Sequence, residues 1–210
     1  MSDDIFIKSR DKINFVGNFE DFYNKKNNWN QDLEGNHLLE EYNYSRNKIL
    51  DNLKNFSLQS IADIGCGYGM FTNQIKVSFP KIKVSGYDIS KTSINIAKNR
   101  YKKNLNFYNH DIISQPLEQK YDLLLLNQVI YYLIHKEKQS LTNIINSTNR
   151  YIYLSIFMND NHTYGELHFR KKDLLIKYLT KEYNLFMVLS DNKRINNNEC
   201  FGVIFDVNKK

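Results

Sequence analysis

The chain has 210 residues, of which 41% are hydrophobic and 25% are charged, and its 29 basic and 23 acidic residues give a net charge of +6. This length and composition are typical of one globular domain with a substantial core, so we expect residues 1–210 to form a single domain. The two cysteines, Cys66 and Cys200, belong to no C-x-x-C pair, which argues against a zinc site or a disulfide framework.

The hydrophobic residues predict neither a membrane span nor a signal peptide. The longest aliphatic run in the middle of the chain, the four leucines at 123–126, is far too short to cross a bilayer. The first ten residues lack the basic-then-apolar layout of a signal peptide. We therefore expect a cytoplasmic protein. The lysines form no long basic run, so most of the positive charge is interpreted as solvated surface.

The first predicted elements precede a glycine-rich turn. Residues 1–35 are polar with scattered aromatic residues and predict a loosely helical extension. Residues 36–53 place apolar side chains at helical spacing, which predicts a helix with one solvent-exposed face. A strand follows at 60–64, and a helix runs from the glycine turn to about residue 78, before Pro80 ends the unit.

The rest of the chain alternates strands with helices. Strands are predicted at 82–88, 105–112, 121–129 and 150–157, and helices at 93–103, 136–146 and 171–183. Two further apolar runs, 184–191 and 199–207, predict an antiparallel hairpin that closes the sheet edge. Alternating strands and helices predict an α/β fold with a mostly parallel sheet and a core of residues 36–207.

The most informative segment is Ile61 to Thr72, which reads IADIGCGYGMFT. Three glycines at alternate positions follow Asp63 and precede a helix, which predicts a tight turn that binds a nucleotide-like ligand. The spacing is not the G-x-G-x-x-G of dinucleotide sites. A carboxylate before the turn would repel a pyrophosphate but suits a ligand with a positive amino group.

This motif resembles the first motif of the class I S-adenosylmethionine (SAM)-dependent methyltransferases, D-x-G-C-G-x-G. The resemblance implies a Rossmann-like, doubly wound, seven-stranded sheet with a C-terminal antiparallel hairpin. Trp29, Tyr23 and the N-terminal helix are expected to form a lid in which Trp29 binds the cofactor, because an aromatic face can favour the sulfonium cation. The alternative is that Trp29 only packs the extension onto the core. It also implies that SAM binds at the turn and leaves as S-adenosylhomocysteine (SAH). Asp63, Gly65, Cys66 and Gly67 are then cofactor-binding residues, with Cys66 serving as a small side chain.

Further candidates lie at strand ends, where open α/β sheets bind their ligands. Asp88 ends the second strand, 23 positions after Gly65, and is expected to accept hydrogen bonds from the ribose hydroxyls. The resemblance implies that Asp111 contacts the adenine amino group and that Ile89 or Ile112 packs on the adenine ring.

Asn127 and Gln128 end the fourth strand, which lies near the methionine part of SAM in this family. No Pro-Pro-aromatic or Pro-Cys sequence follows, which argues against methylation of nucleic acid bases. The segment LNQVIYYLIH is loosely similar to the nodulation N-methyltransferase group, so Tyr131 is a candidate catalytic residue. His168 and then His162 are the candidate general bases, because histidine titrates near neutral pH. No metal site is expected.

We therefore expect a SAM-dependent methyltransferase that transfers a methyl group to an oxygen or nitrogen of a small molecule, such as a sugar, a nucleotide sugar or a phosphate-bearing metabolite. Two alternatives stay open. The basic isoelectric point, about 9.1, suggests an RNA methyltransferase. The chain could also be a non-catalytic binding subunit with the same fold.

Overall fold

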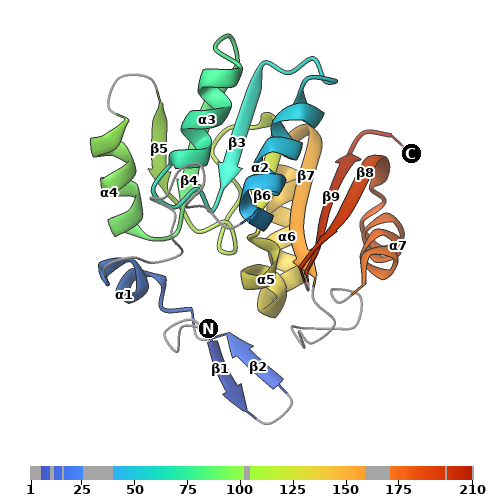
Figure 1. Cartoon of the computed structure of the whole chain (residues 1–210), viewed down its shortest axis with the longest axis horizontal. Helices are drawn as coiled ribbons and strands as arrows, with labels where there is room; N and C mark the ends of the chain where they lie inside the picture. The colour runs from blue at the N-terminus through green and yellow to red at the C-terminus, as the bar shows by residue number, and fades with distance from the viewer. Residues whose placement is uncertain are drawn as a thin grey trace.

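A computed structural model describes residues 6–9, 12–15, 17–25, 40–101, 105–158, 171–196 and 198–209. Its main feature is a seven-stranded sheet with the strand order β5-β4-β3-β6-β7-β9-β8 (Figure 1). The first five strands in that order are parallel, and β9 runs antiparallel to both of its neighbours. The predicted fold class, a mostly parallel sheet with a C-terminal hairpin, is therefore confirmed.

The element bounds lie close to those predicted for the core. The sheet strands are β3 Ser60–Ile64, β4 Lys83–Asp88, β5 Asn106–Asn109, β6 Tyr121–Asn127, β7 Thr148–Met158, β8 Phe186–Ile195 and β9 Asn198–Asp206. The helices of the core are α2 Glu40–Leu53, α3 Met70–Ser78, α4 Lys91–Arg100, α5 Ile130–Leu133, α6 Glu137–Asn146 and α7 Lys172–Tyr183.

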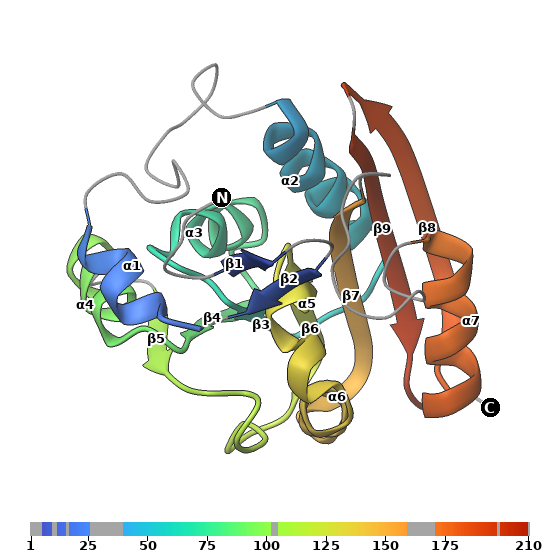
Figure 2. The ribbon, with the colours of Figure 1, turned by 90° about the horizontal axis from the view of Figure 1, so that it is seen from below.

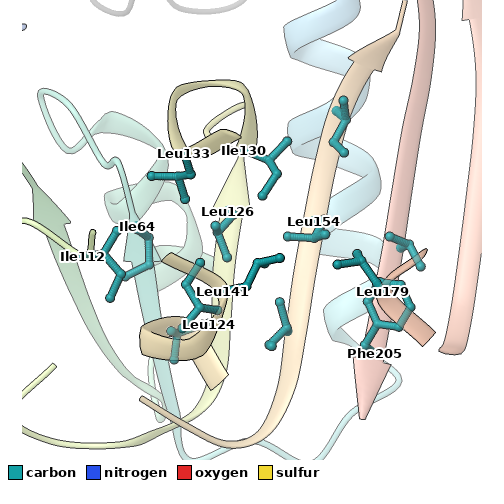
Figure 3. Close-up of a cluster of buried hydrophobic side chains, with 14 of the residues drawn as sticks. Ile64, Ile112, Leu124, Leu126, Ile130, Leu133, Leu141, Leu154, Leu179 and Phe205 are labelled. Atoms are coloured by element: carbon teal, nitrogen blue, oxygen red, sulfur yellow. The ribbon is translucent and has the colours of Figure 1, made fainter. Parts of the chain in front are cut away.

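Strand β6 shows why the sheet is covered on both faces. Its leucines alternate in direction, as the period of a strand requires. Leu124 and Leu126 belong to a buried cluster with residues of α6 and α7, which Figure 3 shows in close-up. Leu123 and Leu125 belong to a second buried cluster with residues of α2 and α3. Figure 2 shows α2 and α3 on one side of the sheet and α6 on the other.

The N-terminal extension is only partly helical, so the prediction of a loosely helical segment is wrong for its first part. Strands β1, Phe6–Ser9, and β2, Lys12–Phe15, pair with each other in an antiparallel hairpin. Only α1, Phe19–Asn24, is a helix. Scattered aromatic residues do not fix a period of 3.6, and short runs rich in isoleucine and phenylalanine favour strands. No helix of the described residues is long and apolar enough to span a membrane.

Candidate functional site

The candidate site lies where the chain reverses its direction of travel across the sheet. From β3 the chain proceeds to β4 and β5 on one side, and then returns to place β6 and β7 on the other side. Ligands of open α/β folds bind beyond the carboxyl ends of the strands at such a switch point. Apart from Trp29, the predicted cofactor residues lie at the carboxyl ends of β3, β4 and β6 or in the loops after β3, β4, β5 and β6, and therefore gather at one edge of the sheet.

The glycine turn after β3 has a backbone that only glycine adopts without strain. Gly65, Gly67 and Gly69 have φ values of +72°, +53° and +78°. A Cβ on Gly65 would lie 2.5 Å from Cγ2 of Val129, so the loop after β6 packs directly on this turn. Cys66 is buried in the turn, and burial raises the pKa of its thiol well above the ordinary value. It therefore packs as a small neutral side chain rather than acting as a thiolate.

Asp63 is buried at the end of β3, only 2% exposed. Its Oδ2 accepts a hydrogen bond of 2.6 Å from Thr72 Oγ1 on α3. Burial raises the pKa of the carboxyl to about 7, while the Thr72 hydroxyl and the Arg46 charge oppose that rise. A positive group placed beside Asp63 would favour the ionised form of the carboxyl.

Arg46, on α2, is a candidate that the sequence motifs do not contain. Its side chain is buried and its Nε has no hydrogen-bond partner. Nη1 lies 3.7 Å from Met70 Sδ at the start of α3, and the guanidinium carbon lies 5.5 Å from the centre of the Phe71 ring. Burial lowers the pKa of Arg46, and the charge of Asp63 opposes that shift. A buried cation with an unpaired donor is suited to a carboxylate ligand.

The spacing of α2 contains the one signal that could have identified Arg46. This residue lies three positions before Ile49 and seven before Leu53, the two apolar residues of α2 that are buried in the core. A helix places such positions on one face, so an arginine there must be buried. Asp63 and Arg46 together offer one negative and one positive group beside the glycine turn, as a zwitterionic amino acid would require.

Asp88, at the end of β4, is buried with both carboxylate oxygens in use. Oδ2 accepts a hydrogen bond of 2.8 Å from Gly67 N, and Oδ1 accepts one of 2.9 Å from Ser90 N. Burial raises the pKa of this carboxyl, and the two backbone donors oppose the rise. Each oxygen keeps a second lone pair that a ribose hydroxyl could use. Ile89, the next residue, is a large apolar side chain that is 45% exposed.

The loop after β5 is tied to the loop after β4 by a hydrogen bond of 2.9 Å from His110 N to Asp88 O. The carboxylate of Asp111 faces its own turn, where it accepts hydrogen bonds from Ile113 N and Ser114 Oγ. Ile112 is buried in the core cluster. Contacts of Asp111 and Ile112 with an adenine ring therefore stay predictions.

The end of β6 carries a chain of polar contacts. Asn127 Oδ1 accepts a hydrogen bond of 3.1 Å from Ser45 Oγ on α2, and Ser45 Oγ lies 2.6 Å from Ser155 Oγ on β7. Gln128 Nε2 donates to Ser155 Oγ at 3.3 Å. With one hydrogen on each hydroxyl, the bonds must run from Gln128 through Ser155 and Ser45 to Asn127. This direction points the amide nitrogen of Asn127 away from Ser45.

Gln128 has a left-handed backbone, with φ of +62°. Its Oε1 accepts a hydrogen bond of 2.9 Å from Phe157 N, which extends the pairing of β6 with β7 through a side chain. Tyr131 donates its hydroxyl hydrogen to Phe157 O. The structure therefore brings Asn127, Gln128 and Tyr131 to the edge of the sheet that also carries the glycine turn.

Three predicted residues, Trp29, His162 and His168, lie outside the described residues. Of the helical part of the expected lid, the structure describes only α1. There Tyr23 packs edge-on against Tyr68 of the glycine turn, with ring centres 5.2 Å apart. In the part of the chain that the structure describes, no group of three or more histidine, cysteine or acidic residues could hold a metal ion.

Comparison with known proteins identifies similar domains. Residues 55–156 match the family model described as "Methyltransferase domain". The chain is 33% identical over 111 residues to malonyl-[acyl-carrier protein] O-methyltransferase of Bacillus anthracis, in a match that covers 51% of this chain and 40% of that protein. The chain thus spans less than half of the length of this curated relative.

Two solved structures show the same fold. The N-methyltransferase NodS of Bradyrhizobium japonicum WM9 with SAH superposes with a TM-score of 0.67 at 18% identity, over 90% of this chain and 96% of NodS. Magnesium protoporphyrin IX methyltransferase of Synechocystis PCC 6803 with bound SAH has a TM-score of 0.61 at 16% identity, over 79% of this chain and 83% of that chain.

Proposed function

We propose that the protein transfers a methyl group from SAM to a small molecule. The match of residues 55–156 to a methyltransferase domain and the Rossmann-like fold shared with SAH-bound methyltransferases support this proposal. The observation that carries the proposal is the pair of opposite charges, Asp63 and Arg46, buried beside the glycine turn. A ligand with both an ammonium and a carboxylate group satisfies both side chains.

In this proposal each part of the cofactor has its own partner. Asp63 faces the ammonium group, the unpaired Nε of Arg46 donates to the carboxylate, and Asp88 accepts hydrogen bonds from the ribose hydroxyls. Gly65, Cys66 and Gly67 let the backbone approach the ligand, and Ile89, Asp111 and Ile112 surround the adenine. A buried arginine with an unpaired donor fits a carboxylate, so these residues suit SAM.

The cofactor supplies an activated methyl group, so the main task of the protein is to align the acceptor with it. Good alignment can contribute about 7 to 11 kcal/mol to lowering the barrier. Asn127 and Gln128 lie at the edge where the methyl group would face the acceptor. Tyr131, His162 and His168 remain proposed catalytic residues, of which a histidine would remove a proton from the acceptor where one must leave.

The acceptor is proposed only by class. The relatives include one named as an O-methyltransferase and a structural neighbour named as an N-methyltransferase, so both oxygen and nitrogen acceptors are retained. We propose a small-molecule partner rather than a nucleic acid, and a cytoplasmic location.

Calorimetry with three ligands tests the cofactor assignment. We expect SAM and SAH to bind at micromolar concentrations, and 5′-methylthioadenosine, which lacks the amino acid part, to bind more weakly. Replacing Arg46 with methionine should weaken SAH binding at least about tenfold and leave 5′-methylthioadenosine unaffected, because only SAH carries the carboxylate.

The matched control is Arg150→Met, since Arg150 lies near the start of β7, at the opposite edge of the sheet, and pairs with Asp206. If neither SAM nor SAH binds below millimolar concentrations, the cofactor assignment is wrong. If Arg46→Met weakens both ligands equally, Arg46 supports the fold of the site and does not hold the carboxylate.

A further inference from the structure

Helix α1 contacts three of the loops that carry the proposed cofactor residues. Tyr23 packs against Tyr68 in the loop after β3, and Phe19 packs edge-on against Tyr132 after β6, with ring centres 5.1 Å apart. Between these two aromatic contacts, Glu20 binds the loop after β4. Figures 1 and 2 both show α1 beside α4, near the ends of β4 and β5. A six-residue helix thus connects segments that are far apart in the sequence.

Glu20 makes the polar part of this connection. Its Oε2 accepts a hydrogen bond of 2.9 Å from Ser90 Oγ, and its Oε1 accepts one of 3.1 Å from Thr92 N. Thr92 Oγ1 also donates to Oε1. The carboxylate therefore binds the first turn of α4, where backbone N–H groups have no partner within the helix.

The contact continues from Ser90 to Asp88. Ser90 Oγ accepts a hydrogen bond of 3.1 Å from Ser93 N while it donates to Glu20, so the orientation of the hydroxyl is fixed. Ser90 N in turn donates to Asp88 Oδ1 at 2.9 Å. Glu20 and Asp88 are thus two carboxylates bound to the same serine, one through its side chain and one through its backbone.

This arrangement costs electrostatic energy. The negative charge of Glu20 adds to the rise in the pKa of Asp88, because two like charges repel. The hydrogen bonds from Thr92 and Ser90 lower the pKa of Glu20 itself and keep it ionised. Glu20 is exposed, and exposed polar contacts add little to the stability of a fold. The contact is therefore better explained by a role at the site than by a role in folding.

We propose that Glu20 is a positioning residue for the cofactor: it holds Ser90 and the loop after β4 so that Asp88 faces the ribose hydroxyls, and through Asp88 it slows cofactor release. This inference rests on the proposed SAM-binding function. It assigns a role to a residue of the N-terminal extension, which lies outside the glycine turn and the strand-end motifs.

The test measures the release rate of radiolabelled SAM after a chase with unlabelled SAM. Glu20→Ala should release SAM at least about tenfold faster than the unsubstituted protein. Glu20→Gln retains one acceptor oxygen for Thr92 and should give an increase of about threefold. The control is Asp21→Asn, which removes the same charge from the next residue, whose carboxylate binds Asn18, the N-cap of α1. It should change the rate less than twofold.

A double-mutant cycle separates positioning from a general structural effect. If Glu20 acts through Asp88, Glu20→Ala should have little further effect in an Asp88→Asn background, and the thermal midpoints should show that each variant is folded. Release rates of Glu20→Ala and Asp21→Asn that are alike would overturn the proposal for Glu20. Failure of the unsubstituted protein to bind SAM would instead contradict the proposed function, and the role of Glu20 with it.

Discussion

At the scale of single residues, the site depends on charges that the fold keeps away from water. Asp63 and Arg46 are both more than nine-tenths buried. Burial raises the pKa of Asp63 and lowers the pKa of Arg46, and in each case this favours the neutral form of the side chain. Two opposite charges buried near each other contribute little to stability, because desolvation cancels much of their attraction. Its value lies in presenting two fixed charges to a zwitterionic ligand without reorganisation when the ligand binds.

The raised pKa of Asp63 predicts the pH dependence of stability. The pKa is about 7 in the folded chain, against 3.8 as the ordinary value. The folded state therefore holds the proton more tightly, and this stabilisation is present at low pH and is lost as the pH rises from about 4 to about 7. Urea unfolding of Asp63→Asn should lack that component of the pH dependence.

The same carboxyl predicts the pH dependence of cofactor binding. An ammonium group beside Asp63 favours the ionised form, so below its pKa binding must release a proton. We expect the affinity for SAH to rise about tenfold between pH about 5.5 and about 7, as measured by calorimetry in two buffers. Asp63→Asn and the ligand 5′-methylthioadenosine should both remove this slope. An equal slope for 5′-methylthioadenosine would show that another group, such as Asp88, causes it.

At the scale of elements, α2 connects the site to the C-terminal hairpin. In its middle, Ser45 and Arg46 lie beside the proposed site. At its end, Asn52 Nδ2 donates to Tyr153 OH at 2.7 Å and to Asp191 Oδ2 at 2.6 Å, which joins α2 to β7 and β8. Burial raises the pKa of Asp191, and the Asn52 bond opposes the rise. The position of Arg46 therefore depends on contacts that a helix pattern does not show.

Replacing Asn52 with alanine tests this connection. The change leaves the hydroxyl of Tyr153 and the carboxylate of Asp191 without the Asn52 donor, so we expect the free energy of unfolding to fall by about 1 to 3 kcal/mol. The control is Asn47→Ala on the same helix, where the side chain bonds only within α2 to Asn43. It should change stability by less than about 0.5 kcal/mol in urea unfolding. Equal losses in the two variants would show that Asn52 does not fix α2 to the sheet.

At the scale of the whole molecule, the sequence predicts the elements that depend on residues close together in the chain. Strand β3, the glycine turn and α3 follow from a few adjacent residues, and the runs of apolar residues place the other strands of the sheet. The hairpin of β1 and β2 was not predicted, because four-residue strands are too short to show a period. The contact of Ser45 with Ser155 joins residues 110 positions apart, and no single sequence pattern encodes it.

The net charge of +6 underlies the alternative of an RNA methyltransferase. An RNA-binding surface needs clustered cations, whose contacts with phosphates release counterions and make affinity fall steeply with salt. The lysine pairs of this chain, at 25–26, 102–103, 171–172 and 209–210, are spread along the sequence. We therefore expect only weak retention of total RNA on filters at about 50 mM salt and none at about 200 mM, with SAH affinity unchanged between the two. Submicromolar RNA binding at the higher salt would instead favour RNA as the methyl acceptor.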